Sequence, residues 1–266
     1  MLQQLGTSLR QHQQSEQLQL FSAALTAAIL NNITKMKPRH SSTLLWGLGK
    51  MAAQSTGQGS TRQLSSVDPY SEWDASLDQQ GDAAQQGSQG QRPQGSGVFA
   101  IPAGTLLQRL AATAEAASGR DIAQALYGVA RLKVHLPPST LAHMLAHMQR
   151  QLPSCLPQDL SMCMYALGVL GSEPSQDWMA AFFSSSRTKI EGFSCQALSN
   201  TAWGLAMLEQ RPDAAWLSAF LRATQRCASL LSNQELTTVA WALSKLHLTP
   251  NASWLSMLQV RAGVFT

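Results

Sequence analysis

A fixed spacing of 38 residues constrains the fold of this chain more than any other feature of its sequence. Aromatic residues recur at this step, and each is followed by a proline nine residues later and by a tryptophan thirteen residues later. The three series are Tyr165, Trp203 and Trp241; Pro174, Pro212 and Pro250; and Trp178, Trp216 and Trp254. Such a period is typical of stacked helical pairs, which bury their apolar sides against their neighbours. The sequence therefore predicts an all-α fold, an α-solenoid of helix–turn–helix repeats of about 38 residues.

The same pattern divides the chain into five segments. These are a loosely ordered N-terminus at 1–15, partial first repeats at 16–51, a Gln/Gly/Ser-rich low-complexity insertion at 52–98, the helical repeat array at 99–262 and a tail at 263–266. The insertion is expected to be disordered, because its composition buries too little apolar surface to offset the entropy of ordering it. It separates the first helix at 40–51, around Trp46, from a partner helix that is expected to resume at about 103–117.

Within the array the expected helices alternate in a regular way. First helices are expected at 120–133, 158–170, 196–208 and 234–246, and second helices at 138–151, 175–186, 213–226 and 250–262. Thr249 is the expected N-cap of the last helix, with Pro250 at its first helical position, and Pro174 and Pro212 are expected to act likewise. The chain ends just before another first helix is due, so we expect an exposed apolar face there and a fragment of a longer protein.

Composition narrows the class of function. The chain is 44% hydrophobic, enough for a sizeable core, and has a formal net charge of +4. Outside 52–98 there are 17 basic and 10 acidic side chains, a net charge of +7, which is consistent with a polyanionic partner. Four cysteines without a CxxC pair indicate reduced, intracellular thiols. No apolar run is long enough to span a bilayer, so no membrane insertion is expected. Residues 1–15 lack acids, as a transit peptide does, or are simply a Gln-rich start.

Two sides of each first helix have nearly constant chemistry. Counted from the aromatic as position zero, positions −5, +2 and +5 are apolar and share one side of the helical wheel. We expect that side to pack on the second helices. Positions +1 and +3 are almost all Gly, Ala or Ser, so we expect neighbouring first helices to approach closely. The tryptophans of the second helices and Cys163 are expected in the core.

The remaining side, which we call the variable face, differs between repeats. It consists of position −7 (Arg39, Arg120, Gln158, Gln196, Gln234), position −3 (Thr43, Gln124, Met162, Asn200, Thr238) and position +4 (Lys50, Arg131, Val169, Met207, Lys245). Amides and hydroxyls can hydrogen-bond base edges, whereas Lys and Arg contact phosphates. The pattern favours base reading by position −3, supported by position −7, with Lys50, Arg131 and Lys245 on the RNA backbone. A plain solvated helix face is the alternative.

The position-zero aromatics fall beside the variable face. They are Trp46, Tyr127, Tyr165, Trp203 and Trp241. Such rings can stack on bases, or they can pack between neighbouring helices, and packing is the favoured interpretation. His143 and His147 lie one turn apart on a second helix, a spacing that can hold zinc. No third ligand is evident in the sequence, so we expect no metal and favour a partly exposed helix face.

Three segments carry a resemblance to a known family. LSNTAWGLAML and LTTVAWALSKL, both followed by P-x-x-x-W-L, and SSTLLWGLGKM resemble the octotricopeptide repeat (OPR) of green-algal organelle proteins. They also resemble the related leucine-rich helical region of FAST-kinase-type mitochondrial proteins. The similarity covers 40–51 and 100–262, and is weaker at 120–151, where Leu136 and Thr140 replace the proline and the second tryptophan.

The resemblance implies an α-solenoid that binds single-stranded RNA, with about one nucleotide per repeat. It implies a chloroplast or mitochondrial protein that acts on transcript stability, processing, splicing or translation. The implied partners are organellar transcripts or rRNA and other proteins of an RNA-processing complex. Many relatives carry a C-terminal nuclease-like RAP domain, to which nothing here corresponds, so we expect no catalysis and no cofactor. A protein-binding helical-repeat scaffold is the alternative function, and an accessory fragment that needs a separate catalytic domain is a third.

Overall fold

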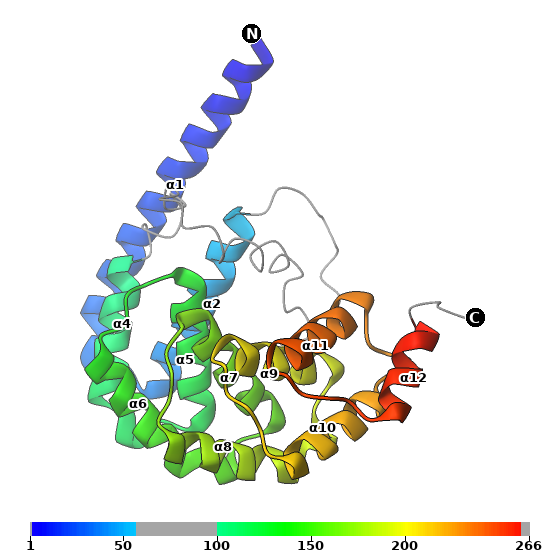
Figure 1. The fold of residues 1–266 in the computed structure, drawn as a ribbon. Coiled ribbons are helices and arrows are strands. Elements are labelled where there is room, and N and C mark those ends of the chain that lie inside the picture. The colour runs from blue at the N-terminus through cyan, green and yellow to red at the C-terminus, as the bar shows by residue number, and fades with distance from the viewer. Residues whose placement is uncertain (1, 57–99, 262–266) are drawn as a thin grey trace.

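The computed structural model describes residues 2–56 and 100–261, and within these ranges it contains helices and turns but no strand. The helices form two curved layers, with the outer layer on the outside of the curve and the inner layer inside it (Figure 1). The inner layer consists of α2 (Pro38–Thr56), α5 (Gly119–Leu132), α7 (Pro157–Leu170), α9 (Cys195–Met207) and α11 (Asn233–Lys245). The outer layer consists of α1 (Leu2–Asn32), α4 (Ala100–Ala112), α6 (Pro138–Gln151), α8 (Gln176–Lys189), α10 (Ala214–Arg226) and α12 (Ala252–Arg261).

This arrangement confirms the predicted all-α solenoid. The predicted first helices of the array match α5, α7, α9 and α11 to within one residue at each end, and the second helices match to within three. The helix α4 packs against both α1 and α2, so it is the resumed partner of α2 on the far side of the insertion. The predicted disorder of 52–98 falls almost wholly on residues 57–99, which lie outside the described part of the chain.

The N-terminal prediction needs two corrections. The helix α1 begins at Leu2, whereas residues 1–15 were expected to be loosely ordered. That stretch contains no proline and a single glycine, Gly6, so nothing in it breaks a helix. The helix α2 also continues to Thr56, five residues beyond the predicted end at residue 51. Figure 1 shows the first turns of α1 extending away from the two layers.

The inner helices touch through their backbones, as the small residues at positions +1 and +3 predict. A Cβ atom on Gly204 of α9 would lie 2.5 Å from the carbonyl oxygen of Met164 in α7, and one on Gly128 of α5 would lie 2.3 Å from that of Leu45 in α2. Position +1 therefore faces the preceding inner helix. Position +3 faces the following one, since a Cβ on Gly168 would lie 2.9 Å from the Cα of Gly204.

The apolar side of each inner helix is buried against the outer layer, also as predicted. Positions −5, +2 and +5 are buried throughout α5, α9 and α11, and in α7 the only departure is Leu170, which is half-buried. The second-helix tryptophans lie in the core, and each indole N–H donates to the preceding outer helix. The bonds are Trp178 to the carbonyl of Leu145 (3.1 Å), Trp216 to Oγ of Ser186 (2.8 Å) and Trp254 to Oγ1 of Thr224 (3.0 Å).

The turns between helices repeat with the same step of 38 residues. Four inner helices end in a residue with left-handed backbone geometry, which reverses the chain towards the outer layer. These residues are Lys133 (φ 52°), Gly171 (φ 59°), Glu209 (φ 53°) and His247 (φ 52°). Three of the four are not glycine, so the geometry is imposed by the surrounding packing and costs about 1 kcal/mol at each.

The prolines of the repeat lie just outside their helices, which corrects the prediction that they occupy the first helical position. The N-caps of the outer helices α8, α10 and α12 are the residues that follow each proline. Their side chains accept hydrogen bonds from the backbone N–H groups of the tryptophans: Ser175 from Trp178 (3.2 Å), Asp213 from Trp216 (2.6 Å) and Asn251 from Trp254 (2.8 Å). Thr249 therefore does not cap α12. A proline restricts the residue before it to extended geometry, which suits the turn that precedes the cap.

We expect Gly204→Ala to destabilise the array by about 1–3 kcal/mol, because its methyl group meets rigid backbone rather than a mobile side chain. Gly47 is the matched control: it occupies the same position +1 in α2, and a Cβ there meets nothing within 4 Å. Gly47→Ala should stabilise by about 0.5–1 kcal/mol, because alanine favours the helix. Urea unfolding followed by circular dichroism measures both changes. Equal effects of the two substitutions would contradict backbone contact between the inner helices.

Candidate functional site

The variable face lies on the inner layer, on the side opposite the outer helices. Of the thirteen side chains predicted to bind RNA, twelve are exposed or half-buried. The exception is Met162, which is 0% exposed. The prediction that Met162 reads a base is therefore wrong, because a ligand on the variable face cannot reach a fully buried side chain. The apolar thioether packs among the helices rather than facing solvent.

Arg120 has a structural partner. Its Nε donates to Oδ1 of Asp159 at 3.2 Å, and the Asp159 side chain is only 5% exposed. The other carboxylate oxygen of Asp159 accepts from the backbone N–H of Leu156 at 3.0 Å and caps α7. Asp121, one repeat earlier, accepts from Oγ of Ser42 at 3.1 Å in the same way. Arg120 therefore ties α5 to α7, and only part of its guanidinium faces solvent.

Three of the position-zero aromatics form a ladder between the inner helices. The ring centroids of Tyr127 and Tyr165 lie 6.1 Å apart, and those of Tyr165 and Trp203 lie 5.1 Å apart. Tyr127 and Tyr165 are buried, at 4% and 3% exposure. The packing interpretation is therefore confirmed for the middle of the array, where these two rings cannot stack on a base.

The two ends of the array differ from its middle. Trp241 in α11 is 40% exposed, and Nζ of Lys245 lies 5.6 Å from its ring centroid. Trp46 in α2 is half-buried, and Nζ of Lys50 lies 4.5 Å from its ring centroid. Each lysine follows its tryptophan by four residues, one helical turn, so this pairing could have been found in the sequence. An exposed ring beside a cation offers a base a stacking surface and its phosphate a partner.

Asn200 carries a polar atom that the protein does not satisfy. Nδ2 of Asn200 is buried and has no hydrogen-bond partner in the structure. An unsatisfied donor of this kind costs about 1–3 kcal/mol, and it is rare enough in folded proteins to need a reason. Asn200 occupies position −3 of α9, between Gln196 at position −7 and Trp203 at position zero, and both of these neighbours are half-buried. A ligand with an acceptor at this point would remove the cost.

Much of the positive charge of the chain is used inside the fold. A basic residue near the end of each outer helix from α4 onwards binds the turn that follows the preceding outer helix. Arg109 donates to the carbonyls of Thr34 and Met36, Arg150 to Glu115, Lys189 to Leu152, Pro153 and Cys155, Arg226 to Glu191 and Phe193, and Arg261 to Leu231. These five side chains lie away from the variable face. The cations on the variable face are Arg39, Lys50, Arg131 and Lys245, together with the solvent-facing part of Arg120.

A match to a known family follows the same stretch of chain. The family described as "Tbc2 translation factor, N-terminal domain" matches residues 60–262, which is well over half of the chain. The chain belongs to the Tbc2 N-terminal domain family. Among curated proteins no match was found. The matched region contains the helices α4 to α12, and therefore four of the five inner helices with their parts of the variable face.

Three of the four cysteines have a raised thiol pKa. All four are free thiols. Burial raises the pKa of Cys155 to about 11, and it raises the pKa of Cys163, which is fully enclosed as predicted, far above its ordinary value. Burial and then a hydrogen bond with Cys227 raise the pKa of Cys195 to about 12. Because only the thiolate attacks, the thiols of Cys155, Cys163 and Cys195 are poor nucleophiles near pH 7.

Of the two histidines, His147 has a structural role. His147 is buried at 3% exposure, where Nε2 bonds the carbonyl of Ala117 at 2.9 Å and Nδ1 bonds Arg150 at 2.8 Å. His143 is exposed one turn away. No group of three potential metal ligands occurs among the described residues. Within the same ranges, no helix has the length and apolar character required to cross a membrane.

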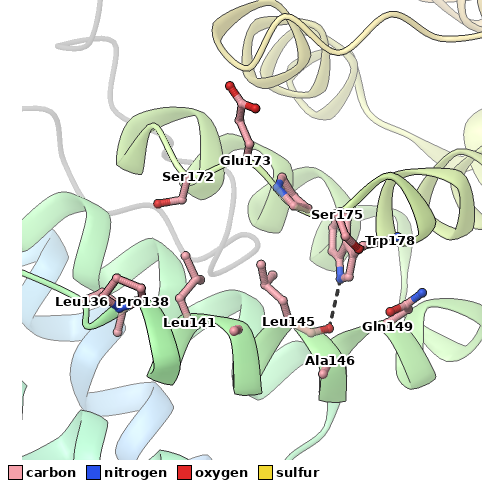
Figure 2. A pocket seen from close by; sticks show the side chains of 12 residues that line it. Leu136, Pro138, Leu141, Leu145, Ala146, Gln149, Ser172, Glu173, Ser175 and Trp178 are labelled. Atoms are coloured by element: carbon pink, nitrogen blue, oxygen red, sulfur yellow. Dashed lines mark hydrogen bonds between the residues drawn. The ribbon is translucent and has the colours of Figure 1, made fainter.

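An apolar pocket of about 420 Å³ lies between α6 and the start of α8, in the outer layer (Figure 2). Leu141, Leu145 and Trp178 line it, and Glu173 is the one charged residue in its wall. One repeat later, the ring of Phe183 packs edge-on against Trp216 at 5.7 Å. Leu145 occupies the position equivalent to Phe183. It has no aromatic ring to pack against Trp178, so the volume that a ring would fill stays open as part of the pocket. The pocket is on the other side of the array from the variable face.

We expect Arg120→Ala to lower the free energy of unfolding by about 1–2 kcal/mol, because it leaves the carboxylate of Asp159 buried with one hydrogen bond fewer. Gln158→Ala is the control, since Gln158 occupies the same position −7 in α7 and makes no comparable ion pair. It should change stability by less than about 0.5 kcal/mol. Thermal and urea unfolding measure both. Equal stability of the two variants would show that Arg120 is available to a ligand after all.

Proposed function

We propose that this chain binds single-stranded RNA along the variable face and acts, without catalysing a reaction, in the translation or processing of organellar transcripts. The observation that carries this proposal is the accessible column of amides, hydroxyls and cations on the inner layer. It recurs on four of the five inner helices in one register, so one extended strand can follow it across the array. Amide and hydroxyl groups suit base edges, and the cations suit phosphates.

The family supports the RNA-related part of this proposal. The matched family takes its name from a translation factor, and translation acts on RNA. The resemblance of the LSNTAWGLAML and LTTVAWALSKL segments to octotricopeptide repeats supports a finer version, in which each repeat holds about one nucleotide in a chloroplast or mitochondrion. Organellar rRNA and the proteins of an RNA-processing complex are further partners under this proposal.

The roles of the side chains follow from their positions. Gln124 and Asn200, both half-buried at position −3, present amides that can pair with a base edge. The amide nitrogen of Asn200 is buried without a protein partner, and it gains an acceptor if this half-buried side chain turns towards a bound base. Trp241 offers an exposed ring to the base at one end of the strand, and Lys245 beside it reaches the neighbouring phosphate.

A protein-binding scaffold is the alternative, and the outer pocket beside Trp178 is the observation that favours it. Binding to RNA and binding to a protein through this pocket differ in their response to salt. RNA releases condensed counterions when it binds cations, so its affinity falls steeply as salt rises. Insertion of an apolar side chain into the pocket responds weakly to salt.

We expect the chain to bind random single-stranded RNA in a filter assay and to lose about 20-fold in affinity between 50 and 200 mM salt, as three phosphate contacts predict. The double substitution Gln124→Ala, Asn200→Ala should weaken binding to a preferred sequence by about 5- to 30-fold, because two amide contacts are lost. The double substitution should change the salt dependence little, since Lys50 and Lys245 at the two ends of the array remain.

The control is Gln108→Ala, Gln259→Ala, which removes two exposed amides of the outer layer. This variant should bind RNA as the unaltered chain does. Absence of binding even at low salt would contradict the RNA proposal for this chain and would favour the scaffold. Equal losses in the two double variants would show that the variable face is not where RNA binds.

A further inference from the structure

The variable face is interrupted in the middle of the array. Its centre is α7, where position −3 is the fully buried Met162 and position +4 is the half-buried Val169. Neither side chain can donate or accept a strong hydrogen bond. The flanking helices differ, because α5 carries Gln124 and α9 carries Asn200 at position −3. Both of these side chains are half-buried, although the amide nitrogen of Asn200 is itself enclosed.

The other polar side chains named on α7 are either hydrogen-bonded or enclosed. Oγ of Ser161 is buried and donates to the carbonyl of Ala197 at 3.0 Å. Asp159 holds Arg120 and caps its own helix. Tyr165 is 3% exposed and lies in the aromatic ladder. On the variable face of α7 this leaves Gln158 at position −7, one helical turn from Met162, as the one polar side chain in reach of solvent. Position −7 is expected only to support the base reading of position −3, and on α7 position −3 supplies no group to support.

Selection between bases depends on paired donors and acceptors at the base edge, and apolar contact with a base is tolerant of its identity. A nucleotide against α7 meets Val169 and the helix surface above Met162, which offer contact without a pattern of donors and acceptors. Position −3 supplies that pattern on both neighbouring helices. This difference between α7 and its neighbours affects which RNA sequence the chain prefers, whereas binding itself does not depend on it.

We infer that α7 holds one nucleotide without selecting its base, so that the RNA preference of this chain consists of two short blocks separated by one unselected position. One block comes from α2 and α5, and the other from α9 and α11. This inference rests on the proposed function, and it names the chemical form of the RNA that the site takes. Under this inference, the burial of Met162 leaves position −3 of α7 without a group that can read a base.

Selection of bound sequences from a pool of short random RNAs tests this directly, with the full chain at low salt. The expected profile has an unselected position between two selected blocks. Val169→Gln places an amide at the half-buried position +4 of α7, where a ligand can reach it, and it should create a preference of about 5- to 150-fold at the silent position. Val169→Leu is the matched control, because it keeps the apolar character and should leave that position silent.

Val169→Asn provides a second variant, with a shorter amide at the same half-buried position, that does not open the core. It should also create selectivity at the silent position, so the inference stays testable if Val169→Gln does not fold by circular dichroism. A contiguous preference in the unaltered chain, with the centre as selective as its neighbours, would overturn this inference and leave the proposed function standing. No binding of any RNA at low salt would overturn both.

Discussion

The structure depends on direct backbone contact between neighbouring inner helices. Gly128 lies against the carbonyl of Leu45, and Gly204 against that of Met164, so close that a methyl group has no room at either place. This contact sets the spacing of α2, α5, α7, α9 and α11. Because the spacing is short and regular, equivalent side chains fall into columns. The variable face combines three of these columns, and they share one side of the array only while the inner helices touch.

The outer layer fixes the curve around that surface. Each second-helix tryptophan donates its indole N–H to the preceding outer helix, and from α4 onwards a basic residue near the end of each outer helix binds the turn after the preceding outer helix. These bonds join neighbouring repeats, as a one-dimensional stack requires. They also use positive charge that composition alone assigns to a polyanion. The net charge of the sequence therefore overstates the cations that face a ligand on the inner layer.

The candidate site was predictable as a column but not residue by residue. Spacing in the sequence identified the helices, the apolar side, the small residues of positions +1 and +3 and the accessible variable face. It treated position −3 as uniform, and there the structure separates the half-buried Asn200 from the fully buried Met162. It also gave Arg120 to a ligand, whereas the carboxylate of Asp159 on the next helix holds it. Both differences come from neighbours that lie about one repeat away in the chain.

The sequence by itself determined the helical class, the repeat of 38 residues and which side of each helix is apolar, because these follow from local periodicity and from residues that start and stop helices. Only the tertiary structure decided which aromatics are buried in the ladder and which, like Trp241, remain exposed. It also decided which polar groups are already bonded. Burial and pairing depend on the residues that packing brings alongside from other repeats, and periodicity within one helix carries no information about them.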